Sequence, residues 1–338
     1  MAFDPEAAAQ PGSGIFGLPS ELESARIVLC PVPFAATVSY GGGAERGPEA
    51  ILQASHQVDL YDFHFGRVYE AGIHLEAPDP DIVDAHDRGR AAAAPCIEAG
   101  GVPAGDPRCA AVDDAGALVN RSLGARARAL LERGKVVGVL GGDHSVPFAA
   151  IEAAAERGPV GVLHVDAHAD LREAYEGFAW SHASIMHNVL ARCPNVVRLV
   201  QLGIRDYSEA ELRAIHASGG RVLTHFAADW SRRRFAGEAF DALVAEALQP
   251  LPERVWISVD IDGLDPALCP NTGTPVPGGL QFDELAHVLH RLAESGREVV
   301  GFDLVEVAPG EGEWDANVGA RVLYKLCGAA ARSLGGSP

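Results

Sequence analysis

Residues 160–170 have the sequence VGVLHVDAHAD, in which the apolar run 160–165 leads directly into a cluster of aspartates and a histidine. The same arrangement occurs in residues 136–145, VVGVLGGDHS, and in residues 255–266, VWISVDIDGLDP. Short apolar runs without strict alternation are typical of strands that are covered on both faces. These segments therefore predict buried strands whose ends carry polar side chains.

The rest of the chain extends this pattern. Segments rich in Ala, Leu, Glu and Arg predict helices at residues 123–133, 148–157, 240–248 and 282–294. Apolar runs predict strands at residues 27–32, 136–140, 160–165, 196–202, 222–224, 255–259 and 299–304. Strands that alternate with helices favour an α/β fold with a mostly parallel sheet between helical layers.

Residues 76–120 differ from the rest in composition. They are rich in Ala, Gly, Pro and Asp, and they show little apolar periodicity. Because α/β chains of this length often remain one domain, we expect a single domain over residues 1–338, with a partly helical surface excursion at 76–120. The glycine triplet at 41–43 lacks the G-x-G-x-x-G spacing and does not indicate a dinucleotide site.

The polar clusters are expected to converge, because ligands of an open parallel sheet bind at the carboxyl ends of its strands. Together they supply two imidazoles and four carboxylates, from His144, Asp166, His168, Asp170, Asp260 and Asp262. Carboxylates packed this closely repel one another unless cations neutralise them. Two divalent metals roughly 3.5–4 Å apart would do so and would activate a water. Mixed oxygen and nitrogen ligands suit Mn²⁺.

A simpler interpretation of each motif is a solvated loop or a helix N-cap, which a single D-x-D or D-x-H commonly represents. Three such clusters, each at the end of a predicted strand, favour a metal site over that alternative.

The segments GGDHS, DAHAD and SVDIDGLDPA resemble the signature segments of the ureohydrolases, the family of arginase, agmatinase, guanidinobutyrase and formimidoylglutamase. The resemblance extends over residues 135–328, with a weaker match at 41–52. It implies a three-layer α/β/α fold around a mostly parallel sheet of about eight strands. It also implies two Mn²⁺ per chain and a homo-oligomer, a trimer or a hexamer.

Carried over to this sequence, the resemblance implies two ligand sets: His144, Asp166, Asp170 and Asp260 for one metal, and Asp166, His168, Asp260 and Asp262 for the other. Asp166 and Asp260 would be shared. A metal-activated water would attack the guanidinium carbon, and the tetrahedral intermediate would collapse to urea and an amine. Asp170 is also expected to position that water.

Two further residues match the family. His182, in the segment WSHAS at 180–184, stands where the family keeps a histidine that gives a proton to the departing amine. Glu306 follows the predicted strand 299–304 and matches the glutamate that holds the substrate guanidinium in a two-point fork. The alternative for each is a loop residue without a catalytic task. His164, inside a predicted strand, is expected to be a core residue.

The segment LREAYEGFAW at 171–180 bears on the substrate. The corresponding arginase loop is rich in Asn, Ser and Thr, whereas this one has no Asn or Thr, carries Glu173 and Glu176, and is similar to that of prokaryotic agmatinases. Such a loop suits a small cationic guanidino substrate, and agmatine, which would yield putrescine and urea, fits best. Arg172 keeps guanidinobutyrate open, because it could pair with a carboxylate.

Other functions also remain open. Arginase, guanidinobutyrase or another guanidino or formimidoyl hydrolase would use the same residues. A single-zinc amidohydrolase of the histone-deacetylase type would share a related fold and the D-x-H arrangement, but would lack the second-metal ligands. A scaffolding homologue without metal would be expected to have lost ligands, and all six are present.

Composition narrows the partners. The formal charge is −19, from 46 acidic and 27 basic residues, and such a surface repels nucleic acid and anionic lipid. Residues 1–14 have neither the basic nor the apolar region of a signal peptide, and no run approaches the ~20 apolar residues of a membrane span. The 6 cysteines form no C-x-x-C pair, which is typical of reduced thiols. We therefore expect a cytoplasmic protein.

Overall fold

The computed structural model describes residues 3–10 and 12–335. Its 8-stranded sheet has the order β2-β1-β3-β8-β7-β4-β5-β6, and all paired neighbours are parallel. The strands are β1 Ile27–Val32, β2 Ile73–Leu75, β3 Val136–Gly141, β4 Val160–Val165, β5 Val196–Leu202, β6 Val222–His225, β7 Arg254–Asp260 and β8 Glu298–Val305. The predicted parallel α/β sheet is confirmed, with strand ends that differ by at most one residue. The short edge strand β2 was not predicted.

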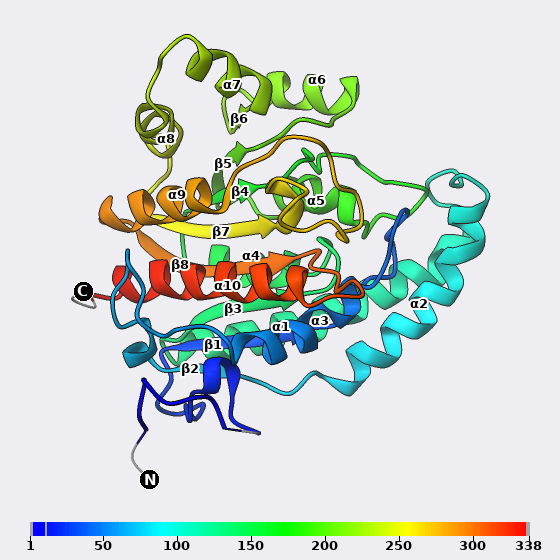
Figure 1. Ribbon diagram of the computed structural model, residues 1–338. Coiled ribbons are helices and arrows are strands. Elements are labelled where there is room, and N and C mark those ends of the chain that lie inside the picture. Colours follow the sequence, from blue (N-terminus) through cyan, green and yellow to red (C-terminus); the bar gives the residue numbers. More distant parts are fainter. Residues whose placement is uncertain (1–2, 11, 336–338) are drawn as a thin grey trace.

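Helices cover both faces of the sheet (Figure 1). They are α1 Gly47–Ser55, α2 Pro80–Glu98, α3 Ala110–Glu132, α4 Phe148–Glu156, α5 Ile185–Arg192, α6 Glu209–Ala217, α7 Ala227–Phe235, α8 Phe240–Leu248, α9 Phe282–Glu294 and α10 Trp314–Ser333. Successive residues of a strand point to opposite faces. In β1, Ile27 and Leu29 therefore pack in the core beneath α1, α8, α9 and α10, whereas Val28 and Cys30 pack beneath α3, α4 and α5. The sheet thus has an apolar core on each face, and each core is covered by a layer of helices, which gives three layers.

Residues 76–120 contain α2, the 3-10 turn η4 Pro107–Cys109 and the first half of α3. The segment is thus mostly helical. Its weak apolar periodicity has a physical reason, because small residues line the contact between α2 and α3. A Cβ added to Gly89 of α2 would lie 3.1 Å from the Cβ atoms of both Ala115 and Ala36. Close helix packing of this kind needs few large apolar side chains.

The last strand in the sequence, β8, lies at the centre of the sheet between β3 and β7. The carboxyl ends of the strands face the side of the molecule on which α2 lies (Figure 1). Among the residues that the structure describes, no helix is long and apolar enough to cross a membrane.

Candidate metal centre

The polar side chains that the sequence singles out follow β3, β8, β7 and β4, which are consecutive in the sheet. His144 follows β3, and the DAHAD segment follows β4. Asp260 ends β7 and Asp262 lies in the 3-10 turn η6 Ile261–Gly263, while Glu306 follows β8. Because the strands are parallel, these side chains meet at one edge of the sheet.

His144 lies at the centre of the first group. Its Nδ1 atom is 3.0 Å from Asp166 Oδ2, 3.2 Å from Asp170 Oδ2 and 3.3 Å from Asp260 Oδ2. Its Nε2 atom lies 2.9 Å from Ser258 Oγ. Because that hydroxyl donates its own proton to Asp303 Oδ1, at 2.8 Å, it accepts the Nε2 proton of His144. This contact fixes a proton on Nε2 and leaves Nδ1 as the nitrogen that faces the three carboxylates, which is the nitrogen a metal would use.

His168 centres the second group. Its Nδ1 atom lies 3.1 Å from Asp262 Oδ2 and 3.5 Å from Asp166 Oδ1. Ligand atoms of these residues lie within 4.8 Å of one another. Asp260 adjoins this group as well, since its Oδ1 accepts the amide of Asp262 at 2.9 Å. The two groups share Asp166, whose two carboxylate oxygens face different histidines.

Burial and mutual repulsion oppose ionisation of most of the carboxylates in these groups. Burial and the neighbouring Asp166 charge raise the pKa of Asp170 to about 7. Burial and the charge of Asp262 hold the pKa of Asp260 well above its ordinary value. Burial also opposes ionisation of Asp166, but His164, His144 and His168 outweigh it and lower its pKa. Buried carboxylates that repel one another around two imidazole nitrogens fit divalent cations with mixed oxygen and nitrogen ligands.

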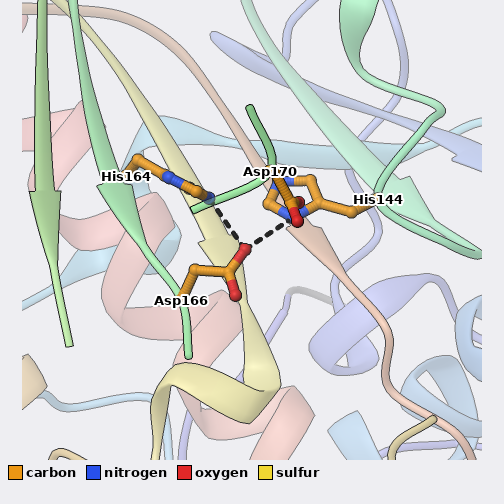
Figure 2. Close-up of side chains that lie close together, drawn as sticks. All are labelled: His144, His164, Asp166 and Asp170. Atoms are coloured by element: carbon orange, nitrogen blue, oxygen red, sulfur yellow. Dashed lines mark hydrogen bonds and ion pairs between the residues drawn. The ribbon is translucent and has the colours of Figure 1, made fainter. Parts of the chain in front are cut away.

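His164 is buried inside β4, as expected of a core residue, but it also contacts the centre. Figure 2 shows His164 and His144 directed at the same oxygen of Asp166. His164 Nε2 lies 2.8 Å from Asp166 Oδ2, and its Nδ1 faces the side-chain amide of Gln201 at 3.0 Å. Since Thr224 donates to the Gln201 carbonyl, Gln201 offers its NH₂ to Nδ1. His164 therefore donates its Nε2 proton to Asp166 and orients it.

A second buried network supports His144. Asp303, on β8, accepts Ser258 Oγ at 2.8 Å and Trp256 Nε1 at 2.6 Å. Gly301 makes room for the indole, because a Cβ there would lie 2.2 Å from the Trp256 ring. Sequence reasoning missed Ser258 and His164. Each precedes a proposed ligand by two residues on a strand and thus points to the same face, which is the signal that could have found them.

His182 stands beside the metal groups without belonging to either. It begins the 3-10 turn η5 His182–Ser184, and its Nδ1 lies 3.2 Å from Thr37 Oγ1. Burial lowers the pKa of His182, although the nearby Asp143 carboxylate acts against that shift. Asp143 of the GGDHS segment holds Thr37 in turn, through its Oδ2.

Glu306 has one engaged oxygen and one free oxygen. Its Oε1 accepts the amide of His144 at 3.0 Å, whereas Oε2 is buried and has no hydrogen-bond partner among the residues that the structure describes. Burial and the Asp143 and Asp262 carboxylates hold the pKa of Glu306 well above its ordinary value. Glu306 also has a φ of 61°, in a region that favours glycine. An unpaired buried oxygen on a strained residue is typical of a binding site, because both features cost stability.

Comparison with known proteins places these residues in one family. The arginase family matches residues 25–328. The chain belongs to the arginase family. It is 34% identical over 309 residues to N(1)-aminopropylagmatine ureohydrolase of Thermus thermophilus, with 90% of each chain covered. It is 29% identical over 313 residues to agmatinase of Pyrococcus horikoshii, covering 92% of this chain and 94% of that one. The agmatine ureohydrolase of Thermoplasma volcanium has the same fold, with a TM-score of 0.71 at 24% identity over 93% of this chain and 92% of that chain.

Membership of the arginase family agrees with the enzyme class expected from the sequence, a hydrolase of C–N bonds in linear amidines. It favours a ureohydrolase over the deacetylase and scaffold alternatives, and the described residues include two His/Asp groups that could hold a metal.

Loop 171–180 is the segment in which family members that act on different substrates are expected to differ in sequence. Arg172 lies 3.7 Å from Glu211 Oε2, and its guanidinium stacks on the Tyr175 ring at 4.9 Å. Tyr175 in turn meets the His182 ring edge-on, with centroids 5.8 Å apart. Arg172 is thus held by Glu211 and Tyr175, outside the groups described above.

The two glutamates of this loop differ in environment. Glu173 is exposed, whereas Glu176 has a buried Oε2 atom that finds no hydrogen-bond partner within residues 3–10 and 12–335. Burial raises the pKa of Glu176, and Arg90 acts against that shift. Glu176 also has a φ of 52°. Glu176 is therefore the loop carboxylate that the fold holds in a partly buried position, and its backbone conformation costs conformational energy.

Proposed function

We propose that this protein binds two Mn²⁺ per chain and hydrolyses the guanidino group of a small cationic substrate to urea and an amine. The observation that carries the proposal is the placement of six metal-ligand side chains beside Glu306, whose Oε2 atom is buried and free. Such an oxygen needs a donor, and a guanidinium offers several N–H groups in one plane.

The metal ligands would divide as the geometry groups them. His144, Asp166, Asp170 and Asp260 would hold one ion, and Asp166, His168, Asp260 and Asp262 would hold the other. When bound, the ions would supply a water that is nucleophilic at neutral pH. His164 and Ser258 would keep Asp166 and His144 oriented for this task.

The other side chains would bind and protonate the substrate. Glu306 would hold the guanidinium through Oε2, with its carbon facing the metal edge of the site. Asp170 would orient the attacking water. His182 would pass a proton to the amine nitrogen as the C–N bond breaks, so that a neutral urea and a protonated amine leave. Overall, one water is consumed for each guanidinium.

The substrate would carry its second positive charge at the end away from the guanidinium. Glu176 supports this, since its unpaired oxygen lacks a donor that an ammonium would provide. Arg172 faces Glu211 and Tyr175, and these contacts support its placement away from the substrate. Agmatine fits this description. N1-aminopropylagmatine has an amine at the same distance from the guanidinium as agmatine does, and carries a second amine beyond it. The 34% identity to a relative named N(1)-aminopropylagmatine ureohydrolase favours this longer compound.

The test is urea release by the Mn²⁺-loaded protein from agmatine, N1-aminopropylagmatine, arginine and 4-guanidinobutyrate. We expect kcat/KM for both cationic compounds to exceed that for arginine by at least about 10², a difference of roughly 2.7 kcal/mol in transition-state binding. Metal analysis of the same preparation should give two Mn²⁺ per chain. Full activity with one zinc per chain would contradict the metal assignment. A preference for arginine or 4-guanidinobutyrate would contradict the substrate assignment.

A further inference from the structure

The two helices α2 and α3, joined through η4, form an antiparallel helical hairpin over residues 80–132. In Figure 1 this hairpin extends along the side of the molecule to which the strand ends point. It carries none of the residues to which the proposed reaction assigns a task. It does, however, contact both loops that border the site, residues 34–38 and residues 176–180.

The contacts to loop 176–180 are specific. Asp113 Oδ1, on α3, accepts the amides of Ala179 at 3.0 Å and of Trp180 at 3.4 Å. Val102, between the helices, donates its amide to Glu176 O at 3.1 Å. Phe178 is fully buried in a separate apolar cluster made of hairpin residues, namely Ala93, Cys96, Cys109 and Val112.

The backbone of this loop has little freedom to move away from the hairpin. Tyr175 and Phe178 exchange both backbone hydrogen bonds around Glu176 and Gly177, which have φ values of 52° and 98°. This is the φ pattern of a type I′ turn, for which a glutamate is an unfavourable residue. A Cβ on Gly177 would lie 2.6 Å from Val102 Cγ2, and one on Gly116 of α3 would lie 2.8 Å from Trp180 Cβ.

The contacts to loop 34–38 come from α2. The Ala35 amide donates to His86 Nδ1 at 3.1 Å. Arg90 donates to Ala36 O at 3.3 Å and to Val38 O at 2.6 Å. Thr37, the residue between these carbonyls, is the one that contacts His182. Helix α2 thus holds the loop that carries Thr37, which contacts His182. Asp113, near the start of α3, holds the loop that carries Glu176.

We propose that the hairpin determines substrate selectivity, and that Asp113 is its positioning residue for Glu176. The proposal rests on the proposed function, in which Glu176 meets the far ammonium of the substrate. Asp113 touches no substrate. By holding the amides of residues 179 and 180 it fixes the turn, and with it the distance between the Glu176 carboxylate and the guanidinium held by Glu306.

The test compares Asp113→Ala with Asp113→Asn in the Mn²⁺-loaded protein. Both amides bind the same oxygen, Oδ1, so asparagine can retain the two hydrogen bonds while alanine cannot. Asp114→Ala removes the same charge from the exposed neighbouring residue and serves as a control. The measurements are hydrogen exchange of the Ala179 and Trp180 amides, metal content, and kcat and KM for agmatine and 4-guanidinobutyrate.

For Asp113→Ala we expect amide protection at residues 179 and 180 to fall about tenfold or more, the scale of one lost hydrogen bond. KM for agmatine should rise by about tenfold while kcat changes by less than about threefold, and the preference for agmatine over 4-guanidinobutyrate should fall by a similar factor. Metal content should not change. Asp113→Asn and Asp114→Ala should resemble the unmodified protein in every measurement.

Three results would overturn the proposal: unchanged amide protection in Asp113→Ala, lost protection with unchanged selectivity, or a joint loss of metal and kcat. A joint loss of metal and kcat would mean that the hairpin stabilises the whole fold and does not act on substrate selectivity alone. If Asp113→Ala does not fold, Phe178→Leu loosens the same turn through its apolar contact and is expected to give the same split between KM and kcat. If the unmodified protein hydrolyses no guanidino compound, the proposed function fails, whereas the exchange measurement still decides whether Asp113 anchors the loop.

Discussion

Thr37 holds His182 at two points with one oxygen atom. Its Oγ1 accepts the backbone amide of His182 at 3.2 Å and lies 3.2 Å from the Nδ1 atom of the same residue. The Thr37 hydroxyl gives its own proton to Asp143 Oδ2 at 3.2 Å. Oγ1 must therefore accept at His182 as well, which places a proton on Nδ1 and leaves Nε2 as the atom that can take up or release a proton.

Replacing Thr37 by valine tests this arrangement, because valine has a similar shape but no oxygen. Without the acceptor, the His182 ring loses both its tautomer and its orientation. We expect Thr37→Val to lower kcat by about tenfold or more, in the range of a weakened general acid, with unchanged metal content. Thr37→Ser keeps the hydroxyl and should retain most of the activity. Equal kcat values for the two variants would show that Thr37 does not set the state of His182.

His182 itself should be needed for proton transfer and not for metal binding. His182→Asn should lower kcat by roughly 10²–10⁴ while the protein keeps its metal. The checks are steady-state kinetics and metal analysis of the same sample. Loss of metal from this variant would make His182 a ligand and would contradict the role proposed for it.

Asp166 and Asp260 are proposed to be shared by both metals, so either substitution by alanine removes a ligand from each. The remaining buried carboxylates would then repel one another with less charge to balance them. We expect kcat to fall by several orders of magnitude and metal content to drop. Asp265→Ala, in the turn after η6, is the control, since Asp265 holds only the turn through Ala267 N and Gln281. A tenth of the original activity in Asp166→Ala would be incompatible with sharing.

Gly273 borders the free oxygen of Glu306. A Cβ there would lie 3.5 Å from Glu306 Oε2 and 3.3 Å from Val38 Cγ1. In Gly273→Ala the methyl group would occupy space that the guanidinium needs, so KM should rise by about tenfold with a smaller change in kcat. Gly312→Ala, where an added Cβ meets nothing within 4 Å, should leave KM unchanged. A guanidinium that binds elsewhere would make the two variants behave alike.

The cysteines are expected to be inert in the folded protein. All six are buried and unpaired. Burial raises the pKa of Cys193 to about 12 and that of Cys109 to about 11. Since the thiolate is the reactive form and a raised pKa depletes it at neutral pH, Ellman's reagent should label these thiols slowly until the chain is unfolded. Rapid labelling at pH 7.5 would mean that the core around them opens.

Much of the fold could be predicted from the sequence, because its central strands are continuous apolar runs that end in polar clusters. The edge strand β2 was not predicted because Ile73–Leu75 is too short to show a period. Helix α2 was not predicted because most of its buried residues are alanine, glycine or cysteine, which give little apolar periodicity. The six proposed ligands could be named because each lies at the end of a strand or within five residues after it. Thr37 and Asp113 could not, since each acts on a residue far away in the chain, at separations of 145 and 66 residues.

The homo-oligomer and the cytoplasmic location stay predictions. Size-exclusion chromatography with light scattering, run with and without Mn²⁺, would decide the first. A trimer or hexamer is the expected result.

The position of β8 in the sheet affects when the proposed metal ligands come together during synthesis of the chain. It is the last strand to emerge from the ribosome, and it is inserted between β3 and β7, which do not pair with each other. Until β8 exists, the chain consists of two partial sheets with unpaired edges, one bearing His144 and the other bearing the ligands that follow β4 and β7. The ion assigned to His144, Asp166, Asp170 and Asp260 has ligands on both partial sheets, so we expect it to bind only after β8 has joined them. The ligands assigned to the other ion all lie at or after the ends of β4 and β7, which pair with each other, so that ion does not depend on β8 in the same way.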